Sequence, residues 1–297
     1  MPELPEVESL VLFLRERIVD RRVSQVALAS ISALKTFNPP VTELVNSQVL
    51  AISRRGKFID VAMVDANGEP IHLVTHLARA GWLQWRDELP TTVPKPGKGP
   101  LAFRIGFVDD DGALAGGFDL TEAGTQKKLT IHVVRDLDDI ERVHQLGPEP
   151  LDEDFTVEVF SALLSAAGRR QLKGLLRDQT TIAGIGNAYS DDILHTAKLS
   201  PFLPADSLDP DVVSRLYDSL RATLNDAMSR SAGLAAGDLK SEKKLGMRVH
   251  GRTGQQCPEC GDVIREVSFA DSSLQYCATC QTGGTPLADR RTSKFLK

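Results

Sequence analysis

The chain has 297 residues, of which 41% are hydrophobic and 25% charged, and its formal net charge is −5. These values are those of an ordinary globular chain with a buried core, and no apolar run approaches the ~20 residues of a membrane-spanning helix. The first residues lack the basic segment and apolar core of a secretory signal. We therefore expect a cytoplasmic protein with no membrane partner, and the length favours two domains or one domain with appendages.

The N-terminal half predicts a helix followed by an antiparallel sheet. Residues 1–18 read MPELPEVESLVLFLRERI, and the prolines and acids at the start suit the N-terminus of an amphipathic helix. Short β-branched runs follow at 22–31, 49–64, 70–77, 101–108 and 129–136, with turn signals such as DANGE between them. The pattern predicts a β-sandwich or barrel domain over residues 1–135.

The periodicity changes to helical after a proline-rich and acidic stretch, LGPEPLDEDF at 146–155. Apolar residues then recur at helical spacing over 156–168, 169–184, 186–199 and 209–231. We expect a linker at 136–151, a helical domain at 152–246, a zinc finger at 247–284 and a basic tail at 285–297. The predicted fold class is α+β.

All four cysteines lie in one short stretch, as CPEC at 257–260 and CATC at 277–280. Two Cys-x-x-Cys pairs in a chain without an export signal indicate one structural zinc ion rather than disulfides. A redox pair or four unrelated thiols is the alternative. The predicted ligands are Cys257, Cys260, Cys277 and Cys280.

The charge is unevenly distributed along the chain. Residues 240–297 contain ten Lys or Arg against six Asp or Glu, a local net of +4, although the whole chain is acidic. A basic C-terminal segment suits a surface that faces phosphates. A solvated tail explains it almost as well.

Five segments in order resemble the formamidopyrimidine-DNA glycosylase and endonuclease VIII family of bifunctional base-excision repair enzymes. They are PELPEVE at the start, RRGKF at 54–58, LGPEPL at 146–151, AGIGNAYSDDIL at 183–194, and VHGRTGQQCPECG leading into the cysteines. The resemblance covers almost the whole chain. It implies a β-sandwich domain behind an N-terminal helix, a helix–two-turn–helix domain and a zinc-finger β-hairpin, acting as a monomer on damaged double-stranded DNA.

The resemblance also implies a catalytic N-terminus. With Met1 removed, the imino group of Pro2 is the nucleophile, Glu3 is the acid that protonates the opening sugar ring, and Glu6 supports the amine or a water molecule. An α-amino group has a pKa of roughly 7.7–8.0, so a useful fraction is unprotonated near neutral pH. Helix capping alone is the alternative interpretation of these residues.

Five side chains are candidates to bind the DNA backbone. Lys57 resembles the family's active-site lysine, and Asn187, in GIGN, its phosphate-binding asparagine. Arg252 and the nearby Arg248 and His250 suit sequence-independent phosphate contacts. Ordinary surface charge explains a lone lysine in RRGKF, and a helix C-cap followed by an N-cap explains GIGN.

The sequence departs from the family's pattern at the residues that contact the lesion. Ser272 stands where the finger normally carries an arginine, and serine brings no charge to a phosphate. Arg79 replaces the methionine that fills the gap left by a flipped base, and Gln126, Lys127 or Lys128 is expected at the other wedge positions. Base flipping costs a few kcal/mol that some side chain must offset, so these departures affect the choice of lesion.

The leading interpretation is a base-excision repair glycosylase that removes oxidised bases and cleaves abasic sites by β-elimination, or β,δ-elimination, through a Schiff base on Pro2. The alternative is a catalytically reduced protein that binds damaged DNA and retains only the clamp. A zinc-ribbon nucleic-acid binder with a purely structural N-terminal helix is a third interpretation. For the leading interpretation, we expect the protein to associate with the nucleoid when it is bound to DNA.

Overall fold

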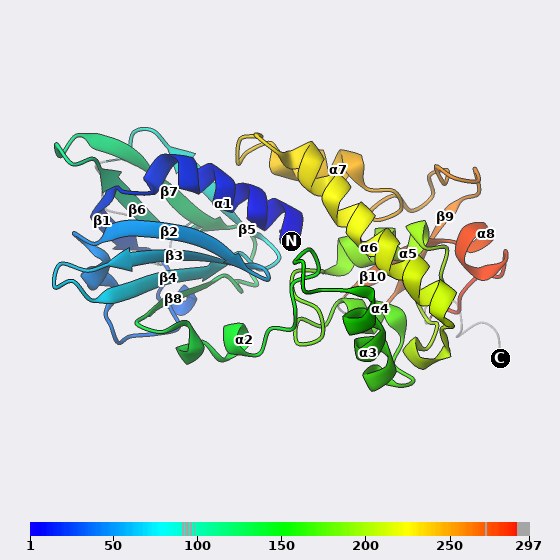
Figure 1. The fold of residues 1–297 in the computed structure, drawn as a ribbon. Coiled ribbons are helices and arrows are strands. Elements are labelled where there is room, and N and C mark those ends of the chain that lie inside the picture. Colours follow the sequence, from blue (N-terminus) through cyan, green and yellow to red (C-terminus); the bar gives the residue numbers. More distant parts are fainter. Residues whose placement is uncertain (91, 93–94, 96, 98, 271, 290–297) are drawn as a thin grey trace. The chain divides into compact units, whose positions relative to one another are not determined.

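The structure is a computed structural model that describes residues 1–90, 92, 95, 97, 99–270 and 272–289. The chain forms two compact units (Figure 1). The N-terminal unit comprises Met1–Gln145 and Ser231–Leu239, and the C-terminal unit comprises Leu146–Arg230 and Lys240–Lys297. In the part of the chain that the structure describes, no helix has the length and apolar character needed to cross a bilayer.

The N-terminal helix α1 (Leu4–Ile18) is amphipathic, as its sequence predicts. Its buried side chains recur three and four residues apart, at Val7, Leu10, Val11, Leu14 and Ile18, which places them on one face. Glu3 is the N-cap and forms a capping box with Glu6, which satisfies backbone N–H groups at the start of the helix. The buried face packs on the sheet that follows.

Eight antiparallel strands of the N-terminal unit form one ladder in the order β5-β7-β6-β1-β2-β3-β4-β8. The strands are β1 (Arg22–Leu28), β2 (Gln48–Arg55), β3 (Phe58–Val64), β4 (Pro70–His76), β5 (Gly81–Arg86), β6 (Leu101–Val108), β7 (Leu114–Glu122) and β8 (Thr130–Val134). Short 3₁₀ turns at Ile31–Ala33 and Val41–Leu44 connect β1 to β2.

The ladder is nearly interrupted between β1 and β2, where only Arg22 and Gln48 are paired. Every other neighbouring pair of strands shares five or more partnered residues. The weak junction lets the two four-stranded halves fold face to face, and side chains of both halves, such as Phe103, Phe118, Val61 and Val133, belong to one buried core. The predicted β-sandwich is therefore confirmed.

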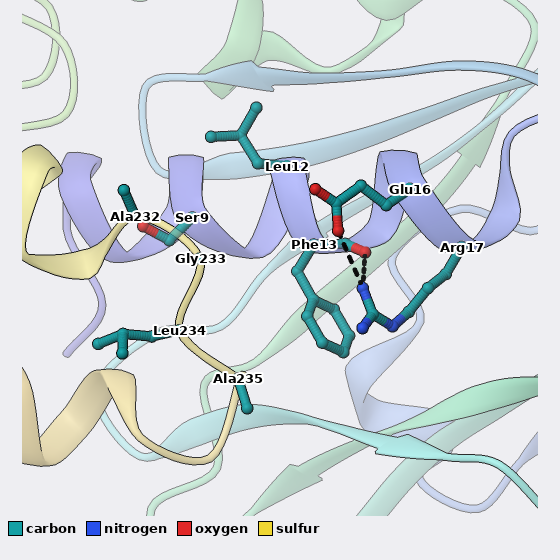
Figure 2. Close-up of a pocket in the computed structure, with 9 residues that line it drawn as sticks. All are labelled: Ser9, Leu12, Phe13, Glu16, Arg17, Ala232, Gly233, Leu234 and Ala235. Carbon is teal, nitrogen blue, oxygen red and sulfur yellow. Dashed lines mark hydrogen bonds and ion pairs between the residues drawn. The ribbon is translucent and has the colours of Figure 1, made fainter.

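The segment Ser231–Leu239 belongs to the N-terminal unit although helices of the C-terminal unit flank it. Figure 2 shows Ala232–Ala235 running beside α1, where they line a cavity of about 140 Å³ with Ser9, Phe13 and Arg17. The Ser9 hydroxyl donates a hydrogen bond to the Ser231 hydroxyl at 2.9 Å, and the Trp82 indole donates one to the Ala236 carbonyl at 3.0 Å. Ala236 and Leu239 are part of the same buried core.

The C-terminal unit is helical with a small hairpin. Its helices are α3 (Val157–Ala167), α4 (Leu172–Leu176), α5 (Asn187–Thr196), α6 (Pro210–Ser231), α7 (Leu239–Gly246) and α8 (Ala278–Thr282), and its hairpin pairs β9 (Ile264–Ser268) with β10 (Ser273–Cys277). The loop between α4 and α5, residues 177–186, carries the two turns of the predicted helix–two-turn–helix element. The predicted α+β fold class is confirmed in each of its parts.

Several elements differ in extent from their prediction. The run 49–64 is two strands, β2 and β3, joined by a turn at Gly56 and Lys57. Strands β5 and β7 were not predicted, and the helix expected over 169–184 is only the five-residue α4. The expected linker at 136–151 contains a 3₁₀ turn (Leu137–Asp139) and a short helix α2 (Glu141–His144). Of the expected basic tail, residues 290–297 lie outside the described residues.

Candidate functional site

The four predicted zinc ligands form one cluster. The sulfur atoms of Cys257, Cys260, Cys277 and Cys280 all lie within 4.8 Å of one another. The Cys257 and Cys280 sulfurs are 3.9 Å apart, and those of Cys260 and Cys277 are 3.4 Å apart. Four sulfurs at ~2.3 Å from one tetrahedral ion are separated by about 3.8 Å, so the spacing fits zinc.

Burial affects the protonation state of one of these thiols. Burial raises the pKa of Cys277 to about 11, and hydrogen bonds with the Cys260 and Cys257 thiols contribute to the rise. Without an ion the Cys277 thiol is therefore protonated at neutral pH, and the four sulfurs lie close together. A divalent cation reverses that preference because it binds thiolates and releases their protons. The donor set fits a structural Zn²⁺.

The N-terminal residues of the predicted active site are buried together at the start of α1. Pro2 is buried, and Glu3 and Glu6 are 2% and 3% exposed. The Glu3 backbone N–H donates to the Glu6 carboxylate at 2.8 Å. The capping box thus holds both carboxylates beside the residue whose nitrogen is predicted to react.

Lys57 lies in the tight turn between β2 and β3, where Gly56 adopts a positive φ of 56°. Its side chain is buried, which is unusual for a surface lysine. The Arg54 guanidinium donates to the Glu8 carboxylate at 2.8 Å and to the Gly56 carbonyl at 3.0 Å. This pair ties the turn that carries Lys57 to the first half of α1, so both belong to the N-terminal unit.

A neutral histidine lies close to this lysine. The pKa of His76 is lowered to about 3, mainly by burial and also by the positive charges of Arg142 and Lys57. The His76 ring packs at 4.8 Å from Phe58, and the Ala78 backbone N–H donates to its Nδ1 at 3.3 Å. The imidazole therefore stays uncharged at neutral pH beside the Lys57 turn.

The predicted wedge residues lie on two loops of the N-terminal unit. Arg79 is exposed in the turn between β4 and β5, and Gln126, Lys127 and Lys128 are exposed on the loop between β7 and β8. The Lys127 ammonium donates to the Gly99 carbonyl at 3.0 Å. The Lys128 backbone N–H donates to the buried Glu122 carboxylate at 2.7 Å. Glu122, which no sequence motif indicated, thus fixes one end of this loop.

Asn187 is the first residue of α5, directly after the GIG loop. The loop is held by Gln179, whose side-chain amide donates to the Ile185 carbonyl at 2.7 Å and whose oxygen accepts from the Gly184 N–H at 3.0 Å. Gly184 has a positive φ of 84°, a conformation that glycine adopts without strain. Asn187 is therefore the first helical residue after a glycine-containing turn, a place in proteins where anions are commonly bound.

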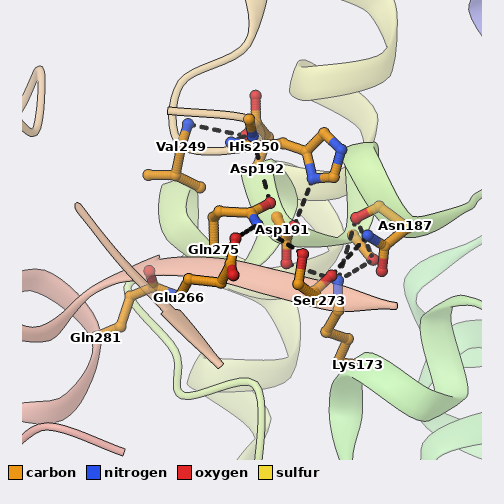
Figure 3. Close-up of polar contacts among 12 residues, drawn as sticks. Lys173, Asn187, Asp191, Asp192, Val249, His250, Glu266, Ser273, Gln275 and Gln281 are labelled. Carbon is orange, nitrogen blue, oxygen red and sulfur yellow. Dashed lines mark hydrogen bonds and ion pairs between the residues drawn. The ribbon is translucent and has the colours of Figure 1, made fainter. Parts of the chain in front are cut away.

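The side chain of Asn187 joins α5 to the finger hairpin (Figure 3). Its Nδ2 donates to the Ser273 carbonyl at 2.8 Å. Its Oδ1 is buried and has no hydrogen-bond partner among the described residues. Ser272, the predicted substitute for the family's arginine, lies one residue earlier, in the hairpin turn that the Phe269 N–H closes by donating to the Ser272 carbonyl at 2.8 Å.

A buried ionic network contacts the backbone carbonyl of Asn187 (Figure 3). The Lys173 ammonium donates to the Asp191 carboxylate at 2.6 Å, the Ser190 hydroxyl at 2.9 Å and the Asn187 carbonyl at 3.1 Å. The other carboxylate oxygen of Asp191 lies 2.7 Å from His250 Nδ1. His250, one of the expected phosphate contacts, is thus oriented by α5.

The next residue, Asp192, fixes the segment that enters the finger. Its carboxylate accepts the backbone N–H groups of Arg248 at 2.6 Å, Val249 at 3.0 Å and His250 at 3.1 Å. Arg252 lies in the same segment, and its guanidinium donates to the Gln255 side chain at 2.9 Å and to the Met247 carbonyl at 3.3 Å.

Lys173, Asp191 and Asp192 are not among the residues that the sequence motifs indicated. The one signal in the sequence was that a lysine and two consecutive acids interrupt the apolar spacing of helical segments, where a buried charge needs a partner. Such residues are almost never fully buried unless they are paired.

Three comparisons with known proteins agree with this architecture. Residues 1–135 match the formamidopyrimidine-DNA glycosylase N-terminal domain, residues 146–236 match the formamidopyrimidine-DNA glycosylase H2TH domain, and residues 254–283 match the zinc finger found in FPG and IleRS. A formamidopyrimidine-DNA glycosylase of Pelotomaculum thermopropionicum is 30% identical over 292 residues, which cover 95% of this chain and 99% of that protein.

The chain belongs to the formamidopyrimidine-DNA glycosylase family. An uncharacterized formamidopyrimidine-DNA glycosylase-like protein of Mycobacterium tuberculosis is 53% identical over 152 residues, which are 51% of this chain and 94% of that protein. Among solved structures, the Lactococcus lactis Fpg complex with DNA containing an abasic site has a TM-score of 0.78 at 26% identity, covering 94% of this chain and 99% of that one. Thermus thermophilus MutM (FPG) has a TM-score of 0.76 at 30% identity, covering 96% of this chain and 100% of that one.

Membership of this family confirms three sequence predictions: the family itself, the enzyme class of DNA glycosylase, and the zinc cofactor on four cysteines. The roles expected for single side chains, from Pro2 to Ser272, remain predictions.

Proposed function

We propose that this glycosylase removes oxidised bases from double-stranded DNA and cleaves the resulting abasic site through a covalent intermediate on Pro2. The observation that carries the proposal is the arrangement at the start of α1, where Pro2 is buried next to the capping box of Glu3 and Glu6. A secondary amine beside two carboxylates has the groups needed for nucleophilic attack and for proton transfer.

The proposed reaction begins when the Pro2 nitrogen, freed by removal of Met1, attacks C1′ of the damaged nucleotide. A C1′–N bond to proline forms, the glycosidic bond breaks, and the base leaves with a proton. Glu3 protonates the ring oxygen as the sugar opens, which leaves a cationic iminium. The iminium acts as an electron sink, so a C2′ proton is lost and the 3′ phosphate leaves by β-elimination. A second elimination expels the 5′ phosphate in the same way.

We assign phosphate binding to both units. The buried Lys57 of the N-terminal unit supplies a positive charge, and Asn187 at the start of α5 supplies a side-chain amide. Ser272 and Arg252 are the candidate contacts from the finger segment. Arg79 and the loop with Lys127 and Lys128 are exposed side chains of the N-terminal unit and are the candidates to fill the space of a flipped base.

We further propose that the protein acts as a monomer in the cytoplasm, on DNA of the nucleoid. The relatives are bacterial proteins, and one of them is solved in complex with DNA containing an abasic site. We also propose the following domain boundaries: an N-terminal domain at 1–135, a linker at 136–151, a helical domain at 152–246, a zinc finger at 247–284 and a basic tail at 285–297.

Borohydride trapping tests the proposed chemistry. Protein with a processed N-terminus, incubated with a duplex containing an abasic site and then reduced, should form a covalent adduct that mass spectrometry assigns to the N-terminal peptide at Pro2. Pro2→Gln, whose larger second residue prevents removal of Met1, should reduce adduct formation at least tenfold. Pro5→Ala, in the first turn of the same helix, is the matched control and should form the adduct.

Glu3→Gln separates the two halves of the reaction. An abasic site is already partly ring-opened as an aldehyde, so this variant should still be trapped on an abasic duplex while it fails to excise an intact oxidised base. An adduct located on a lysine would overturn the role of Pro2. Binding of the abasic duplex without any adduct would support the alternative, a protein that only recognises damage. The uncharged Ser272, in place of an arginine, is the residue that motivates this alternative.

A further inference from the structure

One buried histidine outside the four-cysteine set contacts the zinc cluster. His195 lies on α5, is completely buried, and places its Nε2 at 3.2 Å from the sulfur of Cys257, which is itself 3% exposed. This distance is that of a hydrogen bond to sulfur. The contact joins a helix of the helix–two-turn–helix element directly to a residue of the metal site.

The position of His195 follows from the periodicity of α5. Asn187, Asp191 and His195 are spaced four residues apart, so they lie on one face of the helix. Each of them contacts a different part of the finger: Asn187 binds the Ser273 carbonyl, Asp191 contacts His250, and His195 contacts Cys257. The finger therefore packs against one face of α5, and the last residue of that face, His195, contacts the zinc ligand Cys257.

The second ring nitrogen fixes the direction of the hydrogen bond. The Arg248 Nε–H donates to His195 Nδ1 at 3.4 Å. Because Nδ1 accepts a hydrogen bond, the proton of the neutral ring is on Nε2. The Nε2–H group therefore points at the Cys257 sulfur, which accepts it as a thiolate when the ion is bound.

We propose that His195 is part of the zinc centre as a hydrogen-bond donor to the Cys257 thiolate. It is a positioning residue that retains the ion without coordinating it. A donor to a metal-bound thiolate disperses the charge of the sulfur, in the way that outer-sphere partners tune other metal sites, where their loss typically costs 10–100-fold in affinity. The buried setting strengthens the bond because water does not compete with it.

The test is the rate at which an excess of a metal chelator removes Zn²⁺ from the full-length zinc-loaded protein. His195→Phe removes the donor while it keeps a buried ring, and it should release zinc at least ~10-fold faster. His195→Gln, whose amide N–H occupies the place of Nε2–H, should stay within about threefold of the unsubstituted protein, whereas the shorter His195→Asn should behave like His195→Phe. Thr196→Val, the adjacent residue of α5, is the matched control and should leave the rate unchanged.

Cobalt-substituted protein gives a second readout that needs neither DNA nor activity. A hydrogen bond stabilises the sulfur lone pairs, so its loss in His195→Phe should shift the thiolate-to-cobalt charge-transfer band to lower energy, and His195→Gln should restore it. Should His195→Phe fail to fold, the comparison of His195→Gln with His195→Asn still decides the question. Equal zinc-release rates and unshifted bands in all His195 variants would overturn the proposal.

Discussion

Acidification should destabilise the N-terminal unit through His76. The pKa of this buried side chain is lowered from its ordinary value of 6.5 to about 3, because burial disfavours the charged ring and Arg142 and Lys57 repel it. Between pH 6.5 and pH 3, His76 therefore binds a proton in the unfolded chain but not in the folded unit. The contribution of His76 to stability is complete above pH 6.5 and is lost as the pH falls from 6.5 towards 3.

The magnitude follows from the two pKa values. At pH 5 the unfolded histidine is almost fully protonated while the folded one is not, and this difference costs about 2 kcal/mol of unfolding free energy relative to pH 8. His132, whose pKa burial lowers to about 4, adds to the loss in the same direction. The total is a large fraction of the ~5–15 kcal/mol that stabilises a typical domain.

Denaturant unfolding at pH 8 and pH 5, followed by tryptophan fluorescence, measures this effect. The two tryptophans of the chain, Trp82 and Trp85, both belong to the N-terminal unit, so their signal reports on that unit. His76→Gln should lose about 2 kcal/mol less between the two pH values than the unsubstituted protein. His144→Gln, whose side chain is 64% exposed, is the matched control for replacing a surface histidine of the same unit. An identical pH dependence in His76→Gln would refute the reasoning.

Two further predictions concern packing and charge. Lys173→Met should destabilise the C-terminal unit by about 3–5 kcal/mol, because it leaves the buried Asp191 without its ammonium partner. Tyrosine fluorescence during denaturant unfolding measures this loss, since all three tyrosines lie in that unit. Lys244→Met, at an exposed position, is the control and should change the unfolding free energy by less than about 0.5 kcal/mol. Gly81→Ala should cost about 1–3 kcal/mol or more in the N-terminal unit, because the added Cβ would lie 2.1 Å from the Leu77 carbonyl oxygen. Gly237→Ala, where the Cβ meets nothing within 4 Å, should be nearly neutral by the same tryptophan assay, and equal losses in both glycine variants would contradict the steric argument.

Local signals in the sequence predicted the elements that depend on local chemistry. The two Cys-x-x-Cys pairs predicted the metal cluster, and the apolar spacing after Glu3 predicted α1. Strand β7 escaped prediction because Gly116 and Gly117 lower its apparent strand propensity. The structure gives the reason for Gly117: a Cβ there would lie 2.2 Å from the Ile105 carbonyl oxygen of β6.

Contacts between distant residues could not be predicted from the sequence. Lys173, Asp191 and His250 meet only because α4, α5 and the entry to the finger pack together, and no local pattern encodes that meeting. His195 is a similar case. In sequence it is one histidine in an amphipathic helix, and its contact with a zinc ligand 62 positions away becomes visible only in three dimensions.

The return of Ser231–Leu239 to the N-terminal unit means that no single cut in the chain yields that unit intact. A fragment that stops at residue 145 would expose the apolar surface that Ala236 and Leu239 cover, and it would leave the Trp82 indole N–H without its carbonyl acceptor. A study of the N-terminal unit in isolation must therefore also supply this nine-residue segment.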